Sequence, residues 1–243
     1  MQVLLQCIVS GILLGGLYAI IGIGLSIVFG IMKLTNIAHG TLMILSSFFI
    51  MVIVNNFIPN VFLAILVAIV LMVIVAFLFQ KFLVNAVIDK GDEPALLVTF
   101  GLSIILQDAM LLVFTADARH AGAAYSSIVL KIGGISIALL DIILLVLSLV
   151  TILVLTLFLN KTYMGRSIRA TSDDTQAAAL MGVSVRKTYA VAMGIAMATA
   201  AVAGLCIGLK WTFYASSGGS YLLIAFGVVV IGGMGSIPGT LVA

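Results

Sequence analysis

The sequence predicts an all-α protein, a polytopic transmembrane helical bundle of about seven spans that forms a single domain over 1–243. Three observations predict this class. Hydrophobic residues make up 64% of the chain and charged residues only 8%, against about 25% in an average soluble domain. The mean hydropathy is +1.39. No charged residue occurs in 1–32, 34–80, 188–209 or 211–243, and each run can hold one or more stretches of the roughly 20 apolar residues that a membrane-spanning helix needs.

The individual spans are assigned from the apolar runs between charges and turn residues. The first run is too long for one straight span, so a tilt or a break is expected in it. Pro59 and the neighbouring asparagines mark a turn at 55–60. The predicted spans are about 3–32, 34–54, 61–79, 94–115, 135–159, 188–209 and 221 to the end of the chain.

The sixth span carries a ridge of small residues. Ala192, Ala196, Ala200, Gly204 and Gly208 recur every four residues and therefore share one helix face. Small residues at this spacing allow another helix backbone to approach closely. The pattern predicts that this span packs tightly inside the bundle.

Two glycine-bounded interruptions predict broken helices, near 30–40 and near 232–239. A polar break in an apolar run is typical of a membrane helix that lines a cavity, because irregular backbone is tolerated there. A short interfacial turn with a hydrogen-bonded histidine is the alternative for the first break. The residues that we assign to a translocation path at the two breaks are Asn36, His39, Gly40, Gly232, Gly233 and Gly235.

Asp108 is the most conspicuous isolated polar residue. It lies about two-thirds of the way along the fourth predicted span, where a carboxylate costs roughly 2.5–3.5 kcal/mol on insertion scales. We expect it to face protein or water, and both a place on the translocation path and a structural pairing with another helix remain open. Asp141 lies near the end of the fifth span and is expected to snorkel or to cap that helix.

The orientation in the membrane follows from the lysine and arginine counts. The loop at about 161–187 holds Lys161, Arg166, Arg169, Arg186 and Lys187, and short loops rich in such residues stay in the cytoplasm. Counting back one crossing at a time predicts an external N-terminus. The net charge of +3 is explained by this loop, and no basic patch indicates nucleic acid as a partner.

The same loop predicts a cytoplasmic helix. Thr171 and Asp174 have capping-box spacing, and Asp173 and Asp174 are favourable in the first turn of a helix. Good helix formers follow, and Gly182 provides a left-handed stop. Ala177, Leu180 and Met181 share one face of this helix. The residues that we expect to dock a soluble partner are Arg169, Thr171, Asp173, Asp174, Ala177, Leu180, Met181 and Gly182.

Two interpretations of this cytoplasmic helix compete. It can lie on the lipid headgroups, although surface-binding helices are usually basic and this one begins with aspartates. Alternatively, its apolar face fits into a groove on a soluble protein.

Three stretches of the sequence resemble the permeases of branched-chain amino acid ABC importers. GRSIRATSDDTQAAALMGVSVRK, from Gly165 to Lys187, is similar to the cytoplasmic motif of that family. The segment from Thr35 to Gly40 resembles its Asn-Phe-Ala-His-Gly segment, and the segment from Ile231 to Gly239 resembles its Gly-rich segment. The three occur in the family's order over nearly the whole chain. Family members continue for some tens of residues beyond the last segment, so the resemblance implies that this chain is shortened at its C-terminus.

The resemblance implies a permease subunit in the cell (inner) membrane, surrounded by lipid. Its implied partners are a second permease subunit, two cytoplasmic ATPase subunits and a periplasmic or lipid-anchored solute-binding protein. The cytoplasmic helix at 171–182 would then carry the motion of the ATPases into the spans. Leucine, isoleucine and valine are the implied cargo, and urea or short amides are carried by similar permeases.

Two further function classes were weighed. An ion-coupled secondary transporter would place several charges within the bundle, and only Asp108 and Asp141 qualify. An enzyme lacks candidates, because His39 and His120 are far apart in the sequence and no metal-ligand helix motif or Walker-type loop occurs. Cys7 and Cys206 lack metal spacing. We therefore expect no enzymatic activity, no cofactor and no metal.

Overall fold

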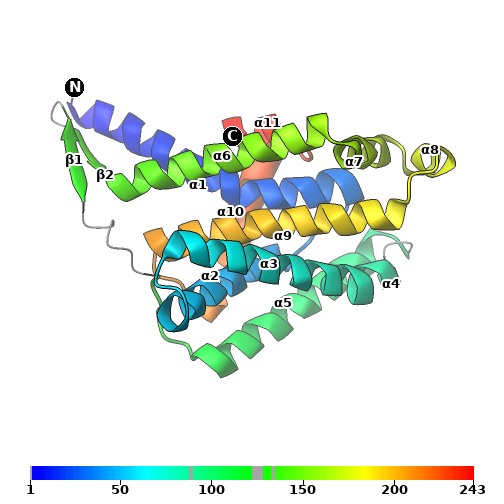
Figure 1. Cartoon of the computed structure of the whole chain (residues 1–243), viewed down its shortest axis with the longest axis horizontal. Coiled ribbons are helices and arrows are strands. Elements are labelled where there is room, and N and C mark those ends of the chain that lie inside the picture. Colours follow the sequence, from blue (N-terminus) through cyan, green and yellow to red (C-terminus); the bar gives the residue numbers. More distant parts are fainter. Residues whose placement is uncertain (1, 88–89, 122–127, 133–134) are drawn as a thin grey trace.

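The structure, a computed structural model, describes residues 2–87, 90–121, 128–132 and 135–243. Helices dominate this part of the chain, and in it seven helices are long and apolar enough to cross a membrane (Figure 1). The predicted polytopic helical bundle is therefore confirmed.

The elements follow one another along the chain with short connections. The helices are α1 (Gln2–Met32), α2 (His39–Asn56), α3 (Val61–Phe79), α4 (Asn85–Val87), α5 (Asp92–Phe114), α6 (Leu139–Lys161), α7 (Tyr163–Asp173), α8 (Thr175–Leu180), α9 (Val185–Lys210), α10 (Gly218–Gly232) and α11 (Ile237–Val242). A π-helical turn, Gln80–Val84, joins α3 to α4, and a 3₁₀ turn, Ala215–Ser217, precedes α10. The two strands are β1 (Val129–Ile132) and β2 (Ile135–Ala138).

The strand pair corrects one predicted boundary. The sequence reading began the fifth span at Ile135, but β2 runs to Ala138 and the helix begins at Leu139. β1 and β2 pair antiparallel, with Val129 opposite Ala138 and Leu130 opposite Ile137. β-Branched residues around the Gly-Gly pair at 133–134 are a hairpin signal in the sequence, and the apolar character of the run concealed it.

The bundle has two distinguishable ends (Figure 1). The N-terminus and the β1–β2 hairpin lie at one end, which we call the hairpin end. α7 and α8 lie at the other end, which we call the α8 end. α1 is one unbroken helix of 31 residues, so its length of about 46 Å exceeds a hydrocarbon core of about 30 Å. Its second half is buried from Gly16 onward, while most of its first half is exposed.

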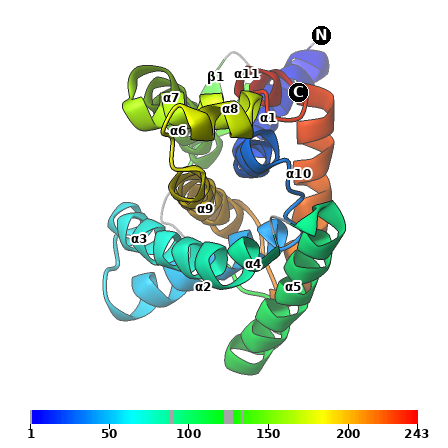
Figure 2. The ribbon, with the colours of Figure 1, turned by 90° about the vertical axis from the view of Figure 1, so that its right-hand side faces the viewer.

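α9 forms the centre of the bundle, with α1, α2 and α3 packed against it (Figure 2). The predicted ridge of small residues makes this possible. A Cβ atom added to Gly204 would lie 2.4 Å from the carbonyl oxygen of Met43 in α2, so the two backbones approach too closely for any side chain. The Ser47 hydroxyl donates to the Gly204 carbonyl at 2.8 Å and adds a polar link between these helices.

The chain re-enters the bundle after α1. The second predicted span began at Leu34, but 33–36 are not helical and α2 begins at His39. A Cβ added to Gly24 of α1 would lie 2.7 Å from both His39 Cε1 and Thr199 Oγ1 of α9. Gly24 and Thr199 both lie well inside their helices, so α2 begins in the interior of the bundle. The predicted break near 30–40 is therefore confirmed.

A second re-entrant segment meets the first. The chain leaves α9 at Lys210, and α10 begins at Gly218, three residues before the predicted start of the seventh span. A Cβ on Gly40 would lie 2.0 Å from the Gly218 carbonyl oxygen, so the backbones of the two segments are in direct contact. At the far end of α10, the non-helical stretch 233–236 confirms the predicted break near 232–239.

Candidate functional site

The first set of predicted path residues, Asn36, His39 and Gly40, lies at the start of α2 in the interior. Asn36 and His39 are completely buried. The side-chain oxygen of Asn36, Oδ1, accepts a hydrogen bond of 3.1 Å from the Ala38 amide and so shapes the turn into α2. In this conformation protein encloses the three residues. They do not line the open cavities that lie between other described residues.

Several nitrogen atoms of this cluster lack hydrogen-bond partners in the described part of the chain. They are Nδ2 of Asn36 and both ring nitrogens of His39. Buried polar atoms are costly unless they are paired. A water or another molecule that offers both a donor and an acceptor would satisfy these nitrogens.

α5 supplies further polar residues that the sequence reading missed. Thr99 Oγ1 accepts from the Ile37 amide at 3.3 Å, and the Thr41 and Ser103 hydroxyls lie 2.8 Å apart. Thr99 and Ser103 are four residues apart, and so they share the face of α5 that meets the re-entrant turn. The four-residue spacing of Thr99 and Ser103 was the signal in the sequence that could have identified this polar face. Isolated hydroxyls in an apolar span do not by themselves predict a contact.

Asp108 lies apart from this polar cluster. Its side chain is exposed on α5, and no hydrogen bond or ion pair to it occurs among the residues that the structure describes. Asp108 therefore does not pair with another helix of the described fold, and the expectation that it faces protein or water stays a prediction. The sequence shows where Asp108 lies along its span. It does not show which side of α5 packs against the bundle.

The glycines of the second break lie at a different place, next to the end of α1. Gly233 and Gly235 have φ angles of 88° and 86°, a region that favours glycine. A Cβ on Gly30 would lie 2.5 Å from Gly235 Cα, so these two backbones touch. Gly232 packs equally closely against Gly239. The two predicted halves of the path are therefore separate clusters, one in the interior and one towards the α8 end.

The predicted cytoplasmic helix is divided into α7 and α8, which corrects the expected cap. Thr171 lies inside α7, where it is buried and donates to the Ser167 carbonyl at 2.8 Å. Asp174 is the N-cap of α8 instead and accepts from the amides of Gln176 at 2.8 Å and Ala177 at 3.0 Å. A carboxylate that satisfies two free amides is a strong N-cap, and it starts a new helix here.

The predicted docking face is open. The side chains of Leu180 and Met181 are 88% and 85% exposed, and Ala177 is exposed as well. Gly182 has φ 83° and ends the helix as predicted. Ala178 provides the buried contact of α8 with the rest of the chain. α8 projects from the end of the bundle, so these apolar side chains form a small patch without a cover (Figure 1).

Two contacts join α7 to the spans. Ser172 Oγ donates to the Gly30 carbonyl at 2.5 Å, and Arg169 Nη1 donates to Asn160 Oδ1 at the end of α6, also at 2.5 Å. Arg169 was predicted to dock a partner, and in the structure it interacts with its own chain. Ser172 was missed because nothing in its local sequence indicates a contact 142 residues away.

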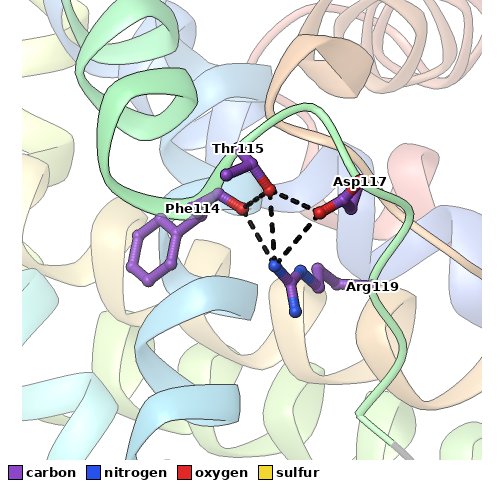
Figure 3. Close-up of polar contacts among 4 residues, drawn as sticks. All are labelled: Phe114, Thr115, Asp117 and Arg119. Carbon is purple, nitrogen blue, oxygen red and sulfur yellow. Dashed lines mark hydrogen bonds and ion pairs between the residues drawn. The ribbon is translucent and has the colours of Figure 1, made fainter.

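At the hairpin end, the end of α5 is closed by an arginine clasp (Figure 3). Arg119 Nη2 donates to the Phe114 carbonyl at 3.1 Å and lies 3.5 Å from Asp117 Oδ2. Thr115, which has φ 66°, donates to the same carboxylate at 2.6 Å. The Arg119 backbone pairs with Phe213, so the clasp also holds the segment that follows α9. A cation at a helix C-terminus is favourable, and the cluster functions as a structural cap.

A second polar contact at this end joins α9 to α6. Lys210 forms an ion pair with Asp141. Trp211 lies between two tyrosines, with ring centroids 6.5 Å from Tyr18 and 6.2 Å from Tyr221. No group of three or more histidine, cysteine or acidic residues that could bind a metal ion occurs among the described residues.

Comparisons with known proteins agree on one family. A family model described as "Branched-chain amino acid transport system / permease component" matches residues 7–243. The chain is 28% identical to the high-affinity branched-chain amino acid transport system permease protein BraD of Pseudomonas aeruginosa, over 98% of the chain and 81% of the relative. Identity to the LivH permease proteins of Escherichia coli K12 and Salmonella typhimurium is also 28%, over 98% of the chain and 82% of each relative. No solved structure matches the chain.

Proposed function

The chain belongs to the family of branched-chain amino acid transport system permease components, and we propose that it forms the membrane pathway of an ATP-driven importer for leucine, isoleucine and valine. The observation that carries this proposal is the family match over 7–243, together with relatives whose printed names specify high-affinity branched-chain amino acid transport. The seven helices of the described residues that are long and apolar enough to cross a membrane are those of a multi-pass membrane protein. Relatives of this kind are transport permeases and not enzymes.

The α8 end is proposed to face the cytoplasm and to contact the ATPase subunits. Its loop carries the cluster of lysines and arginines that the positive-inside rule places there. The exposed Leu180 and Met181 on a short capped helix fit a groove on a soluble partner. A helix that lay on lipid headgroups would instead be favoured by basic residues, and α8 has none.

The companion permease subunit is proposed to cover the outer face of α5. Asp108 is exposed on this face, although it lies within a span where a lipid-facing carboxylate is costly. A second subunit would give it a protein or water environment. The solute-binding protein would then approach the hairpin end, which lies opposite α8 (Figure 1).

ATP-driven motion is proposed to enter the spans through α7. Movement of α8 displaces α7, and Ser172 transmits this to Gly30, whose backbone rests on Gly235. Both glycine-rich breaks are thus connected to the docking helix through α7, by the contacts of Ser172 with Gly30 and of Gly30 with Gly235. The interior cluster around His39, with its unpaired nitrogens, is the proposed place where the path opens and where the cargo or water supplies the hydrogen-bond partners.

The alternatives weighed from the sequence receive no support from these comparisons. The relatives' printed names specify branched-chain amino acids, which favours them over urea and short amides. An ion-coupled transporter would need partnered charges along the path, and Asp108 has no polar partner within the described chain.

The test is uptake by proteoliposomes that contain the permease pair with its ATPases. With radiolabelled leucine on the binding protein outside and ATP inside, we expect uptake that stops when ATP is replaced by a non-hydrolysable analogue. A protonophore should leave it unchanged. Uptake that collapses with the protonophore while ATP is constant would contradict the proposal, and transport of urea in place of leucine would reassign the cargo.

A further inference from the structure

A cavity lies at the α8 end, next to the second glycine-rich break. It has a volume of about 240 Å³ and lies between α1, α6, α7 and the break at 233–236. It is lined by Ser26, Ile27, Gly30, Ile31, Thr156, Leu159, Asn160, Ile168, Arg169, Ser172, Gly235 and Ser236. The elements that meet here are those through which α7 touches the breaks, so a molecule bound in the cavity would contact all of them.

The polar side of the cavity is suited to a carboxylate. Arg169 is the charged residue among the lining side chains, and its Nη1 atom donates to Asn160 Oδ1 at 2.5 Å. That contact holds the guanidinium at the cavity wall and leaves its other N–H groups available. A guanidinium binds a carboxylate with two parallel hydrogen bonds. The Asn160 amide group and the Ser172 hydroxyl lie beside it.

Much of the remaining lining is aliphatic. Ile27, Ile31, Leu159 and Ile168 form it, and each is no more than 8% exposed. Branched side chains of this kind pack best against another branched aliphatic group, because the gain comes from the apolar area removed from water. The cavity therefore pairs a fixed cation with a small apolar compartment.

We propose that this cavity is a binding site for a free aliphatic α-amino acid from the cytoplasm, and that its occupation inhibits import. The carboxylate binds Arg169, and the side chain enters the isoleucine and leucine wall. Pockets for drug-sized ligands have volumes of about 300–1,000 Å³, so 240 Å³ suits a smaller molecule. The ammonium group has acceptors in the Gly30 carbonyl and the Asn160 side-chain oxygen, each with a second lone pair.

The inhibitory effect follows from the position of the cavity. A ligand between α7 and the break at 233–236 holds both against α1, so it opposes the motion that enters through Ser172. Accumulated product would in this way slow its own uptake. This part of the inference rests on the proposed function, while the existence of the binding site does not.

Binding is tested with the full chain alone in nanodiscs of neutral phosphatidylcholine, with radiolabelled leucine as the probe. We expect saturable binding, competition by isovalerate, which keeps the carboxylate and the branched chain, and no competition by isoamylamine, which lacks the carboxylate. Arg169→Gln should weaken leucine binding by about tenfold or more. Arg166→Gln is the matched control, because Arg166 is exposed on the same helix and does not line the cavity.

Several results would overturn the site. Equal leucine binding by Arg169→Gln and the wild type would place bound leucine elsewhere, for example in the central path. Competition by isoamylamine would remove the role of the carboxylate. A third result is that leucine does not bind in neutral lipid, while the wild type retains phosphatidylglycerol tightly and Arg169→Gln does not. This result would reassign the cavity to an anionic lipid headgroup. If Arg169→Gln does not accumulate in the membrane, Arg169→Lys replaces it, and weaker binding is again expected because the paired geometry is lost.

A second measurement tests inhibition separately. Proteoliposomes of the complete importer are preloaded with leucine, and initial uptake of radiolabelled valine is followed. We expect preloading to reduce the rate in the wild type and in Arg166→Gln, and to leave Arg169→Gln unaffected. Equal inhibition of all three would contradict the regulatory role. A complex that transports nothing at all would instead contradict the proposed function and leave the nanodisc measurement to decide the site.

Discussion

Ser172, on the helix next to the proposed docking helix, donates a hydrogen bond of 2.5 Å to the main-chain carbonyl of Gly30 near the end of α1. Gly30 in turn lies so close to Gly235 that neither position can accept a Cβ atom. The two contacts join three segments that are far apart in the sequence. They make a continuous connection from the edge of the bundle to both glycine-rich breaks.

Replacement of this hydroxyl tests the connection. In Ser172→Ala, α7 loses its hydrogen bond to α1, a change of about 1 kcal/mol, and keeps its own helical structure. We expect leucine uptake per ATP hydrolysed to fall several-fold, with the ATPase subunits still bound. The ratio of uptake to hydrolysis in proteoliposomes measures this. Ser184→Ala is the control, since the Ser184 side chain is exposed and does not cap α9. A ratio equal to that of the wild type would show that Ser172 does not transmit the motion.

The apolar tip of α8 is expected to determine binding of the ATPases. Leu180→Asp with Met181→Asp places two charges where two apolar side chains are almost fully exposed, so the fold should be unaffected. Binding should fall by at least about a hundredfold, because charges are then desolvated in the groove. Co-purification and titration with the ATPase subunits measure it. Phe57→Asp, at an equally exposed apolar residue at the opposite end, should bind the ATPases normally. Undiminished binding by the double variant would place the docking surface elsewhere.

Asp174 is expected to act through its cap and not through its charge alone. Asp174→Ala removes the acceptor of two backbone amides and should destabilise α8 by about 0.5–2 kcal/mol. Asp174→Asn keeps an acceptor and should retain most of the helix. Hydrogen exchange of the α8 amides distinguishes the two variants. If both exchange equally fast, the cap is unimportant and electrostatic attraction to the partner explains the residue better.

The contact between the two re-entrant segments predicts a strong difference between two glycines. In Gly40→Ala the new Cβ meets the Gly218 carbonyl oxygen, and relief of the overlap requires backbone movement that costs roughly 1–3 kcal/mol. Gly219→Ala adds the same methyl group where no atom lies within 4 Å. Thermal unfolding followed by size-exclusion chromatography should therefore show a lower Tm for the first variant and an unchanged one for the second. Similar Tm values would indicate that the segments do not meet as described.

The two intramembrane aspartates should behave in opposite ways. Asp141→Ala leaves Lys210 without its partner in a partly buried position and should destabilise the isolated chain by about 1–3 kcal/mol, between the values for exposed and buried pairs. Asp108→Ala should leave that stability unchanged or slightly raised, since Asp108 is exposed on α5. It should instead weaken association with the companion permease, as measured by pull-down of the tagged subunit. Normal association would remove α5 from the proposed interface.

The errors of sequence interpretation have identifiable causes. The residues of β2 were assigned to the fifth span because they are as apolar as those of a helix, and hydropathy does not distinguish the two. The cap of α8 was placed at Thr171, because its spacing to Asp174 matches a capping box, whereas continuing α7 buries Thr171 and leaves Asp174 free to cap. The sequence left open whether Asp108 pairs with another helix, because the side of α5 that packs inward depends on its neighbours.

By itself the sequence determined the class of the protein, because each long uncharged apolar run can span a membrane as a helix that pairs all its own backbone polar groups. It also located the helix that we propose for docking and both breaks, since glycines and basic loops act locally. Only the tertiary structure decided that the two re-entrant segments touch at Gly40 and Gly218, that Ser172 reaches Gly30 and that Arg169 borders a cavity. Contacts of this kind depend on how whole helices pack, and the residues that make them lie too far apart in the chain for any local pattern to encode them.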